Sequence, residues 1–287
     1  MEITNEMGLP EPFYNAAKTD YTYTDKRYSV TAILKGIREN ILLRRHYDQI
    51  TVDASENIWA IFGTAVHSIL EKAPGTFKQL KEQKIEVPMP NGYVLSGVFD
   101  LYDMETKTLT DYKTGTVYKV LMNEWDDYKK QLLGYAYMLD RCGLKTERAQ
   151  IIMLLKDHSK SKARHEWGYP PHPVYKKEWK FSKQAIYEFG TELINIFKEI
   201  ERCEKLPDEE LPLCTPEQRW AKPEKWALCK KGRKKAIKLY DTREEAEEAL
   251  SKDSSYYVEH RPGLDAKCMD YCNAREYCDY WKEHYGD

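Results

Sequence analysis

Residues 94–115 constrain the fold more than any other stretch of this sequence. Two runs typical of strands, at 94–102 and 108–112, flank a polar turn at 103–107. Alternating apolar positions on either side of a short polar turn predict a β-hairpin. A hairpin needs further strands or helices to cover its apolar face, so the rest of the chain must supply them.

Three charged side chains lie in this hairpin. Asp111 and Lys113 are two residues apart at the end of the second run, so in a strand they project from the same face. Pairing across the hairpin can bring Asp100 of the first run close to them. Two converging carboxylates repel each other unless a cation lies between them, and Mg²⁺ or Mn²⁺ would serve. Taken alone, D-x-K indicates no more than surface charges that flank a turn.

The composition is that of a globular protein rather than a disordered one. The chain has 287 residues, of which 41% are hydrophobic and 32% charged, enough for one large domain or a domain with an appendage. No apolar run approaches the length of a membrane span and the N-terminus lacks a signal-peptide pattern, so we expect a cytoplasmic protein without a membrane partner. The net charge is −2, so nucleic-acid binding would depend on local basic patches.

Two basic segments are candidates for such patches. A helix is expected over residues 29–46, with arginines in its last turn, and a basic loop over residues 156–164. Each is either a solvated surface or a set of phosphate contacts. The residues that would contact nucleic acid are Arg44, Arg45, Lys160, Lys162 and Arg164.

A second helix is predicted over residues 55–72, before the hairpin. Gly63 and His67 lie four residues apart on one of its faces. A histidine on a helix is usually a core or surface residue, but it also suits a metal ion held otherwise by carboxylates. Gly63 would permit close approach of another backbone.

An amphipathic helix is predicted over residues 125–140, after the hairpin. Gln131 and Tyr135 share one of its faces: Gln131 is either a surface amide or a group that orients water or a lysine, and Tyr135 either a core aromatic or a phosphate contact. Residues 150–155 suit a buried strand, and residues 85–89 an edge strand because they contain a proline. This order of elements predicts an α/β fold in which a central mixed sheet is flanked by helices.

None of the seven cysteines precedes position 142, and three fall within eleven residues near the end of the chain. Without secretion, metal binding is a better interpretation of this group than a disulfide framework. A long helix over residues 182–204 precedes the cysteine-rich tail. We therefore divide the chain into an N-terminal arm at 1–28, a core at 29–206 and a C-terminal extension at 207–287.

Four motifs occur in a fixed order: G-x3-H on a helix, G-x-x-D in a strand, D-x-K at the end of the next strand, and Q-x3-Y on a following helix. In this order they resemble the RecB-like branch of the PD-(D/E)xK nuclease superfamily, over roughly residues 29–156. The similarity implies a restriction-endonuclease-like core. The matching residues are Gly63, His67, Gly97, Asp100, Asp111, Tyr112, Lys113, Thr114, Gly115, Gln131 and Tyr135.

The resemblance implies a metal site for Mg²⁺ or Mn²⁺. Asp100 and Asp111 would bind the divalent ions, with His67 and the carbonyl group of Tyr112 as additional ligands. Asp111 stands where many relatives have glutamate, which shortens the reach of the carboxylate but keeps its chemistry.

The resemblance also assigns catalytic roles outside the ligand set. Lys113 would position or activate the attacking water and stabilise charge developing at phosphorus. Gln131 and Tyr135 would support that lysine and the substrate backbone.

The tail is similar to the cysteine-bearing ends of phage-encoded nucleases of this group. It resembles more distantly those of CRISPR-adaptation and helicase-associated nucleases, in which one upstream and three C-terminal cysteines hold a [4Fe-4S] cluster. Cys268, Cys272 and Cys278 match the three C-terminal cysteines, and Cys214 is the preferred fourth ligand, with Cys229 as the alternative. Four thiolates also suit structural Zn²⁺, which spacing alone does not separate from a cluster.

Taken together, these features predict a metal-dependent DNA nuclease. The resemblance favours a phage or prophage exonuclease acting in recombination, repair or replication, with a phage single-strand annealing or recombination protein as a possible partner. An endonuclease, a CRISPR-type processing nuclease and a non-catalytic DNA-binding scaffold with a nuclease fold are the alternatives.

Overall fold

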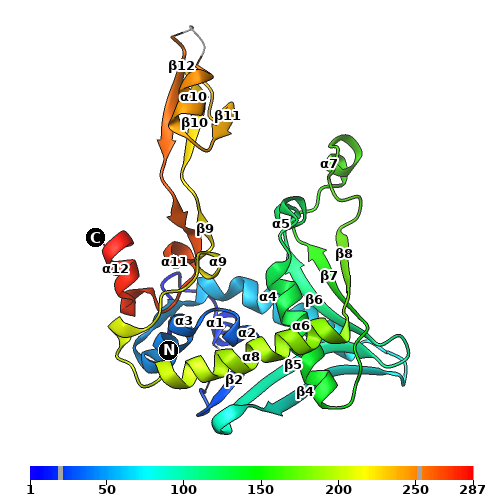
Figure 1. Ribbon diagram of the computed structural model, residues 1–287. Coiled ribbons are helices and arrows are strands. Elements are labelled where there is room, and N and C mark those ends of the chain that lie inside the picture. The colour runs from blue at the N-terminus through cyan, green and yellow to red at the C-terminus, as the bar shows by residue number, and fades with distance from the viewer. Residues whose placement is uncertain (19–21, 251–253, 287) are drawn as a thin grey trace. The chain divides into compact units, whose positions relative to one another are not determined.

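The computed structural model describes residues 1–18, 22–250 and 254–286 and divides the chain into two compact units, Met1–Pro207 and Asp208–Asp287. Figure 1 shows the elements of both units. None of the helices in the described ranges has the length and apolar character needed to cross a membrane.

A six-stranded mixed sheet forms the centre of the first unit (Figure 1). β5 pairs antiparallel with β4 and with β6, whereas β6 and β7 run parallel and β8 closes the other side. β2 pairs parallel with the first part of β5, and β4 lies at an edge as its proline predicts. The strands are β2 (Arg27–Ser29), β4 (Gln79–Pro88), β5 (Val94–Asp103), β6 (Thr108–Gly115), β7 (Arg148–Leu155) and β8 (Val174–Lys180).

Helices flank this sheet, so the predicted mixed sheet flanked by helices is confirmed. α6 packs against β4, β6 and β7, and α8 packs against α6, with Leu132 and Phe197 among the buried side chains. Ser182 caps α8 by accepting a hydrogen bond from the Ala185 N–H at 3.1 Å. The helices are α2 (Val30–Ile33), α3 (Ile37–Arg45), α4 (Ile58–Lys72), α5 (Val117–Met122), α6 (Asp126–Arg141), α7 (Lys160–His165) and α8 (Lys183–Cys203).

Two local predictions need correction, and one strand was missed. The helix expected over residues 29–46 is broken into α2 and α3, because Gly36 has a φ of 118° that a helix does not tolerate. Part of the predicted basic loop forms the short helix α7, capped by Ser159. β8 was not predicted, since its alternating pattern is filled by lysines and aromatic residues rather than aliphatic ones.

The residues of the predicted N-terminal arm contribute elements to the first unit. β1 (Glu2–Thr4) pairs with β3 (Thr51–Asp53), and α1 (Glu11–Ala17) packs near α4. β2 joins the central sheet. Single 3₁₀ turns complete the chain: η1 (Tyr47–Gln49), η2 (Ala54–Asn57), η3 (Pro90–Gly92), η4 (Asp208–Glu210) and η5 (Arg275–Tyr277).

The second unit contains a three-stranded antiparallel sheet in which β10 pairs with β11 and β12. A shorter ladder between β9 and β13 brings residues 221–222 beside residues 264–265. The elements are α9 (Pro216–Arg219), β9 (Ala221–Lys222), β10 (Lys225–Lys230), β11 (Lys238–Tyr240), α10 (Arg243–Glu248), β12 (Tyr256–Arg261), β13 (Leu264–Asp265), α11 (Ala266–Asp270) and α12 (Asp279–Tyr285).

Candidate active site and cysteine group

The β5–β6 hairpin brings the two predicted aspartates to one place. Leu101 pairs with Thr110 across the ladder, and the Tyr112 N–H donates a hydrogen bond to Asp100 Oδ2 at 2.6 Å. Both carboxylates are buried, with Asp100 8% and Asp111 4% exposed. Burial of two neighbouring carboxylates is costly without positive charge nearby.

Asp111 has two side-chain partners. Lys113 Nζ lies 2.7 Å from Asp111 Oδ2 as an ion pair, and Gln131 Nε2 donates a hydrogen bond to Oδ1 at 3.1 Å. Burial raises the pKa of Asp111 to about 6, although the charge of Lys113 opposes this rise. Gln131 therefore supports the carboxylate, whereas the resemblance implied that it supports the lysine.

His67 lies on α4 and faces the same carboxylates. Its Nδ1 is 3.4 Å from Asp100 Oδ1 and 3.5 Å from Glu82 Oε1. The hydrogen bond to Asp100 raises the pKa of His67 to about 9, against the opposing effect of burial. The imidazole of His67 thus lies within reach of both Asp100 and Glu82.

Glu82 is a site residue that the sequence reasoning missed. Lys81 pairs with Leu101 and Gln83 with Phe99, so Glu82 stands opposite Asp100 in the β4–β5 ladder. Its φ of 47° lies in the left-handed region, which costs about 1–2 kcal/mol for a residue with a Cβ. Burial, followed by the charge of Asp100, raises its pKa. The predicted edge strand began only at residue 85, so it did not include Glu82. The observed strand β4 begins at Gln79 and places this glutamate in the sheet.

The donor groups of this site suit a hard divalent ion. One ligand atom from each of His67, Glu82 and Asp100 lies within 4.8 Å of the others. Asp111 is close enough to Asp100 and His67 for both to shift its pKa. An imidazole with several carboxylates matches the ligands that Mg²⁺ and Mn²⁺ accept.

We expect Glu82→Gln to weaken Mn²⁺ binding by about ten- to a hundredfold, because it removes one negative charge from the donor group. Titration calorimetry with the purified protein measures this directly. Glu86→Gln on the same strand is the matched control, since Glu86 pairs instead with Arg27 and Lys84. Equal Mn²⁺ affinities for the two variants would reject Glu82 as part of the site.

Tyr135 contacts the backbone of β5 rather than solvent. It is 6% exposed, and a Cβ added to Gly97 would lie 2.6 Å from its Cε1 atom. The absence of a side chain at Gly97 therefore lets the ring pack, so the G-x-x-D and Q-x3-Y segments are in direct contact. Because Tyr135 is buried, its direct contact with substrate phosphate is not favoured.

Gly63 differs from Gly97. A Cβ added at Gly63 would meet only Thr114 Oγ1, at 3.9 Å, so the predicted close approach of another backbone does not require a glycine there.

The two glycines should respond in opposite ways to alanine. Gly97→Ala is expected to lower the free energy of unfolding by about 1–3 kcal/mol through the clash with Tyr135. Gly63→Ala is expected to raise it by up to about 1 kcal/mol, because alanine is the better helix former and has room. Urea unfolding of both variants tests this, and equal effects would contradict the packing described.

The two predicted arginine contacts already have partners within the first unit. Arg44 donates to the carbonyl groups of Thr24 and Arg27, and its guanidinium lies 3.6 Å from the centroid of the Tyr28 ring. Arg45 donates to the carbonyl oxygens of Glu204 and Leu206 at 3.0 and 2.7 Å. Both side chains thus stabilise the unit, and their role in nucleic-acid binding stays a prediction.

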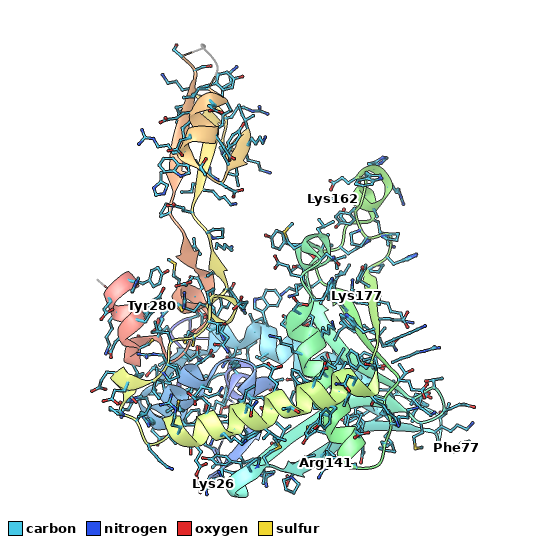
Figure 2. The ribbon with its side chains drawn as sticks, in the orientation of Figure 1. Lys26, Phe77, Arg141, Lys162, Lys177 and Tyr280 are labelled. Atoms are coloured by element: carbon cyan, nitrogen blue, oxygen red, sulfur yellow. The ribbon has the colours of Figure 1, made fainter. Side chains whose placement is uncertain are left out.

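The other three predicted contacts lie on α7. Lys160, Lys162 and Arg164 are exposed on this short helix, between β7 and β8. Figure 2 shows Lys162 at the outer end of this segment. Exposed cations on a projecting segment remain compatible with the predicted phosphate contacts.

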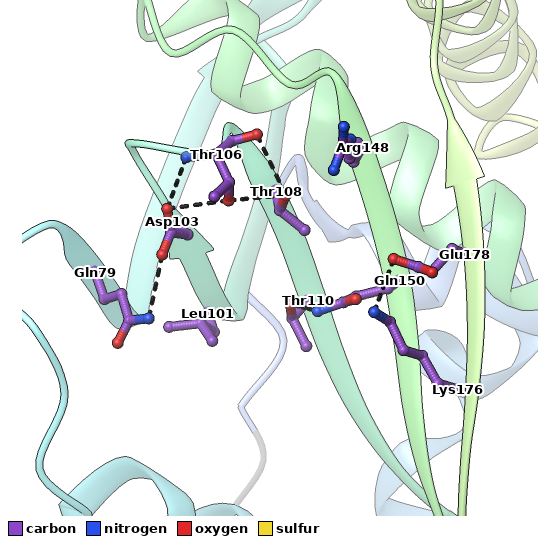
Figure 3. Close-up of a pocket in the computed structure, with 10 residues that line it drawn as sticks. All are labelled: Gln79, Leu101, Asp103, Thr106, Thr108, Thr110, Arg148, Gln150, Lys176 and Glu178. Carbon is purple, nitrogen blue, oxygen red and sulfur yellow. Dashed lines mark hydrogen bonds and ion pairs between the residues drawn. The ribbon is translucent and has the colours of Figure 1, made fainter.

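A shallow pocket of about 220 Å³ lies on the other face of the sheet (Figure 3). Thr108 and Thr110 line it, and they alternate along β6 with the inward-facing Leu109 and Asp111. Because it faces away from the carboxylates, this pocket is separate from the candidate active site. Its lining residues are Gln79, Leu101, Asp103, Thr106, Thr108, Thr110, Arg148, Gln150, Lys176 and Glu178.

In the second unit, three of the predicted cysteine ligands lie close together. Burial raises the pKa of the Cys268 thiol to about 11, and the negative charges of Asp265, Cys214 and Cys278 add to this rise. Cys229 lies elsewhere on β10, where its thiol faces Glu259 at 3.9 Å. These surroundings favour Cys214 over Cys229 as a partner of the C-terminal cysteines.

Comparison with known proteins gives only distant likenesses. No protein-family model and no curated protein match the sequence. The crystal structure of SSO0001 is 15% identical, with a TM-score of 0.45, covering 68% of this chain and 86% of that chain. An alkaline exonuclease, LHK-Exo from Laribacter hongkongensis, is 13% identical with a TM-score of 0.40, covering 62% and 89%. A phage-related exonuclease from Haemophilus somnus 129PT is 14% identical with a TM-score of 0.33, covering 67% and 86%.

Proposed function

We propose that this protein is a metal-dependent nuclease that hydrolyses phosphodiester bonds. The observation that carries the proposal is the group formed by His67, Glu82, Asp100, Asp111 and Lys113, which combines an imidazole, three carboxylates and a lysine. A binding-only protein has no need to gather this many charges around two buried carboxylates.

His67, Glu82, Asp100 and Asp111 would hold the divalent ion. Such an ion supplies positive charge against the phosphodiester and makes an attacking water more acidic. Gln131 keeps Asp111 in place through the hydrogen bond to Oδ1.

Lys113 provides the fixed positive charge of the protein itself. Its ammonium group, 2.7 Å from Asp111 Oδ2, lies where it can stabilise negative charge developing on the phosphoryl oxygens. In the hydrolysis, the water oxygen bonds to phosphorus as the bond to the leaving oxygen breaks, and the water proton passes to solvent or to that oxygen.

DNA is the proposed substrate, and the sequence resemblance favours exonuclease action in phage recombination, with an annealing protein as partner. The test uses linear and covalently closed DNA, each incubated with Mg²⁺, Mn²⁺ or EDTA. Metal-dependent loss of linear DNA alone supports an exonuclease, and nicking of the closed circle indicates an endonuclease instead. Failure of every metal to promote cleavage of either DNA would leave the scaffold function as the better conclusion.

For the second unit we propose a [4Fe-4S] cluster held by Cys214, Cys268, Cys272 and Cys278. The sequence resemblance is the reason to prefer the cluster over structural Zn²⁺, which four thiolates also suit. The effect of Cys214 and Cys278 on the pKa of Cys268 supports a shared site for these three thiols. The role of the cluster would be to stabilise the second unit.

A further inference from the structure

The exposed apolar surface of α4 is unexplained by the proposed chemistry. Helix α4 spans fifteen residues rich in apolar side chains, yet none of its residues is buried. Trp59 is 59% exposed and Phe62 40% exposed. Large apolar groups gathered on a surface usually mark a binding site.

This surface adjoins the candidate active site. Trp59 precedes His67 by eight residues on the same helix, a distance of about 12 Å along its axis. Gly63 lies between them, and a Cβ built there would be 3.9 Å from Thr114 Oγ1, just beyond Lys113 on β6. The helix therefore runs from the proposed metal ligands past the end of β6.

A lysine accompanies the exposed tryptophan. Lys156 Nζ lies 3.2 Å from the centroid of the Trp59 ring, and the Lys156 N–H donates to the Gly115 carbonyl group at 3.0 Å. Helix α5 begins two residues after the end of β6, and its Val117 N–H donates a hydrogen bond to Oδ1 of Asp157, just after β7, at 2.8 Å. The aromatic ring is thus held beside a positive charge at the end of the strand that carries Asp111 and Lys113.

We propose that Trp59, with Phe62 and Lys156, forms a stacking platform for unpaired bases of the nucleic-acid strand whose phosphate enters the active site. Aromatic rings beside cations are the common means of holding single strands, because every base has a π face and every nucleotide a phosphate. The span of about 12 Å along α4 corresponds to roughly three or four stacked nucleotides. The positive charge of Lys156 favours a polyanion over a second copy of this chain as the occupant.

This inference rests on the proposed nuclease function and names its substrate class, a single strand or a frayed end. Binding is therefore measured without cleavage, in full-length protein carrying Asp111→Ala, in EDTA. Single-stranded oligonucleotides carry 2-aminopurine at successive positions, and fluorescence reports stacking while anisotropy gives the dissociation constant. Failure of nuclease activity would leave these readings unaffected, so the two hypotheses fail separately.

Trp59→Ala should weaken single-strand binding about tenfold or more and abolish position-specific quenching. Trp59→Phe should retain most of both, and affinity for blunt duplex should change little. Tyr187→Ala is the matched control, because Tyr187 is a 71% exposed aromatic on the different helix α8.

Three results would overturn the platform. They are an absence of single-strand quenching in the protein with Trp59 intact, unchanged quenching in Trp59→Ala, and equal loss of affinity for single-stranded and duplex DNA. If sedimentation shows that Trp59→Ala instead converts a dimer to a monomer with unchanged DNA binding, the surface belongs to a protein interface.

Discussion

Asp111→Ala is expected to lower metal-dependent DNA cleavage by at least about a thousandfold, while the protein still folds. Burial and the charge of Asp100 both make the ionised carboxylate of Asp111 unfavourable, so its removal stabilises the fold. The substitution also removes the ion-pair partner of Lys113, which destabilises the fold. These effects oppose each other, so we expect the free energy of unfolding to change by less than about 1 kcal/mol. Cleavage of linear DNA and urea unfolding measure the two quantities.

Lys113→Ala separates the lysine from the ligand set. We expect the same loss of cleavage, because the fixed positive charge near phosphorus is gone. Mn²⁺ binding should persist, because the lysine ammonium group has no lone pair with which to coordinate a metal ion. Asp140→Ala, an exposed aspartate at the end of α6, is the control that should retain full activity. Retained cleavage in Lys113→Ala would refute the proposed mechanism.

Cys272→Ser is expected to remove the bound metal of the second unit. Loss of a structural metal should cost that unit about 3 kcal/mol or more, and so lower its unfolding midpoint by about 10 °C or more. Iron, sulfide and zinc analysis of anaerobically purified protein identifies the group, and the visible absorption of an iron–sulfur cluster distinguishes it from colourless zinc.

Two further cysteines give the controls for this experiment. Cys142→Ser should change nothing, because Cys142 is an exposed thiol at the end of α6 in the first unit. Cys214→Ser should match Cys272→Ser, whereas Cys229→Ser should keep the metal. Unchanged metal content in Cys272→Ser would exclude Cys272 as a ligand.

The sequence predicted those parts of the site that depend on local pattern. Alternation placed Asp111 and Lys113 on one face of β6, and the hairpin turn set the pairing that brings Asp100 beside Tyr112. Helical spacing placed Gln131 and Tyr135 on one face of α6, and the structure shows that this face is buried. In each case the pattern within one strand, one hairpin or one helix determines which side chains share a face.

The parts that sequence missed depend on contacts between distant segments. Glu82 reaches the site only because β4 pairs with β5 in one register and because its backbone adopts a φ of 47°. The helical pattern made Arg44 and Arg45 candidates for phosphate contacts. In the fold, their guanidinium groups donate hydrogen bonds to backbone carbonyl groups of other segments. Neither a strand register nor the destination of a long side chain follows from periodicity.

The left-handed backbone at Glu82 has a second consequence. Within the described residues β4 pairs only with β5, so its outer side presents unpaired N–H and C=O groups. A straight edge of this kind can recruit strands from other molecules and start aggregation. The distortion at Glu82, the exposed charge of Lys84 and the missing N–H of Pro88 interrupt that row. The same deviation that turns a carboxylate toward the active site thus also protects the sheet from edge-to-edge polymerisation.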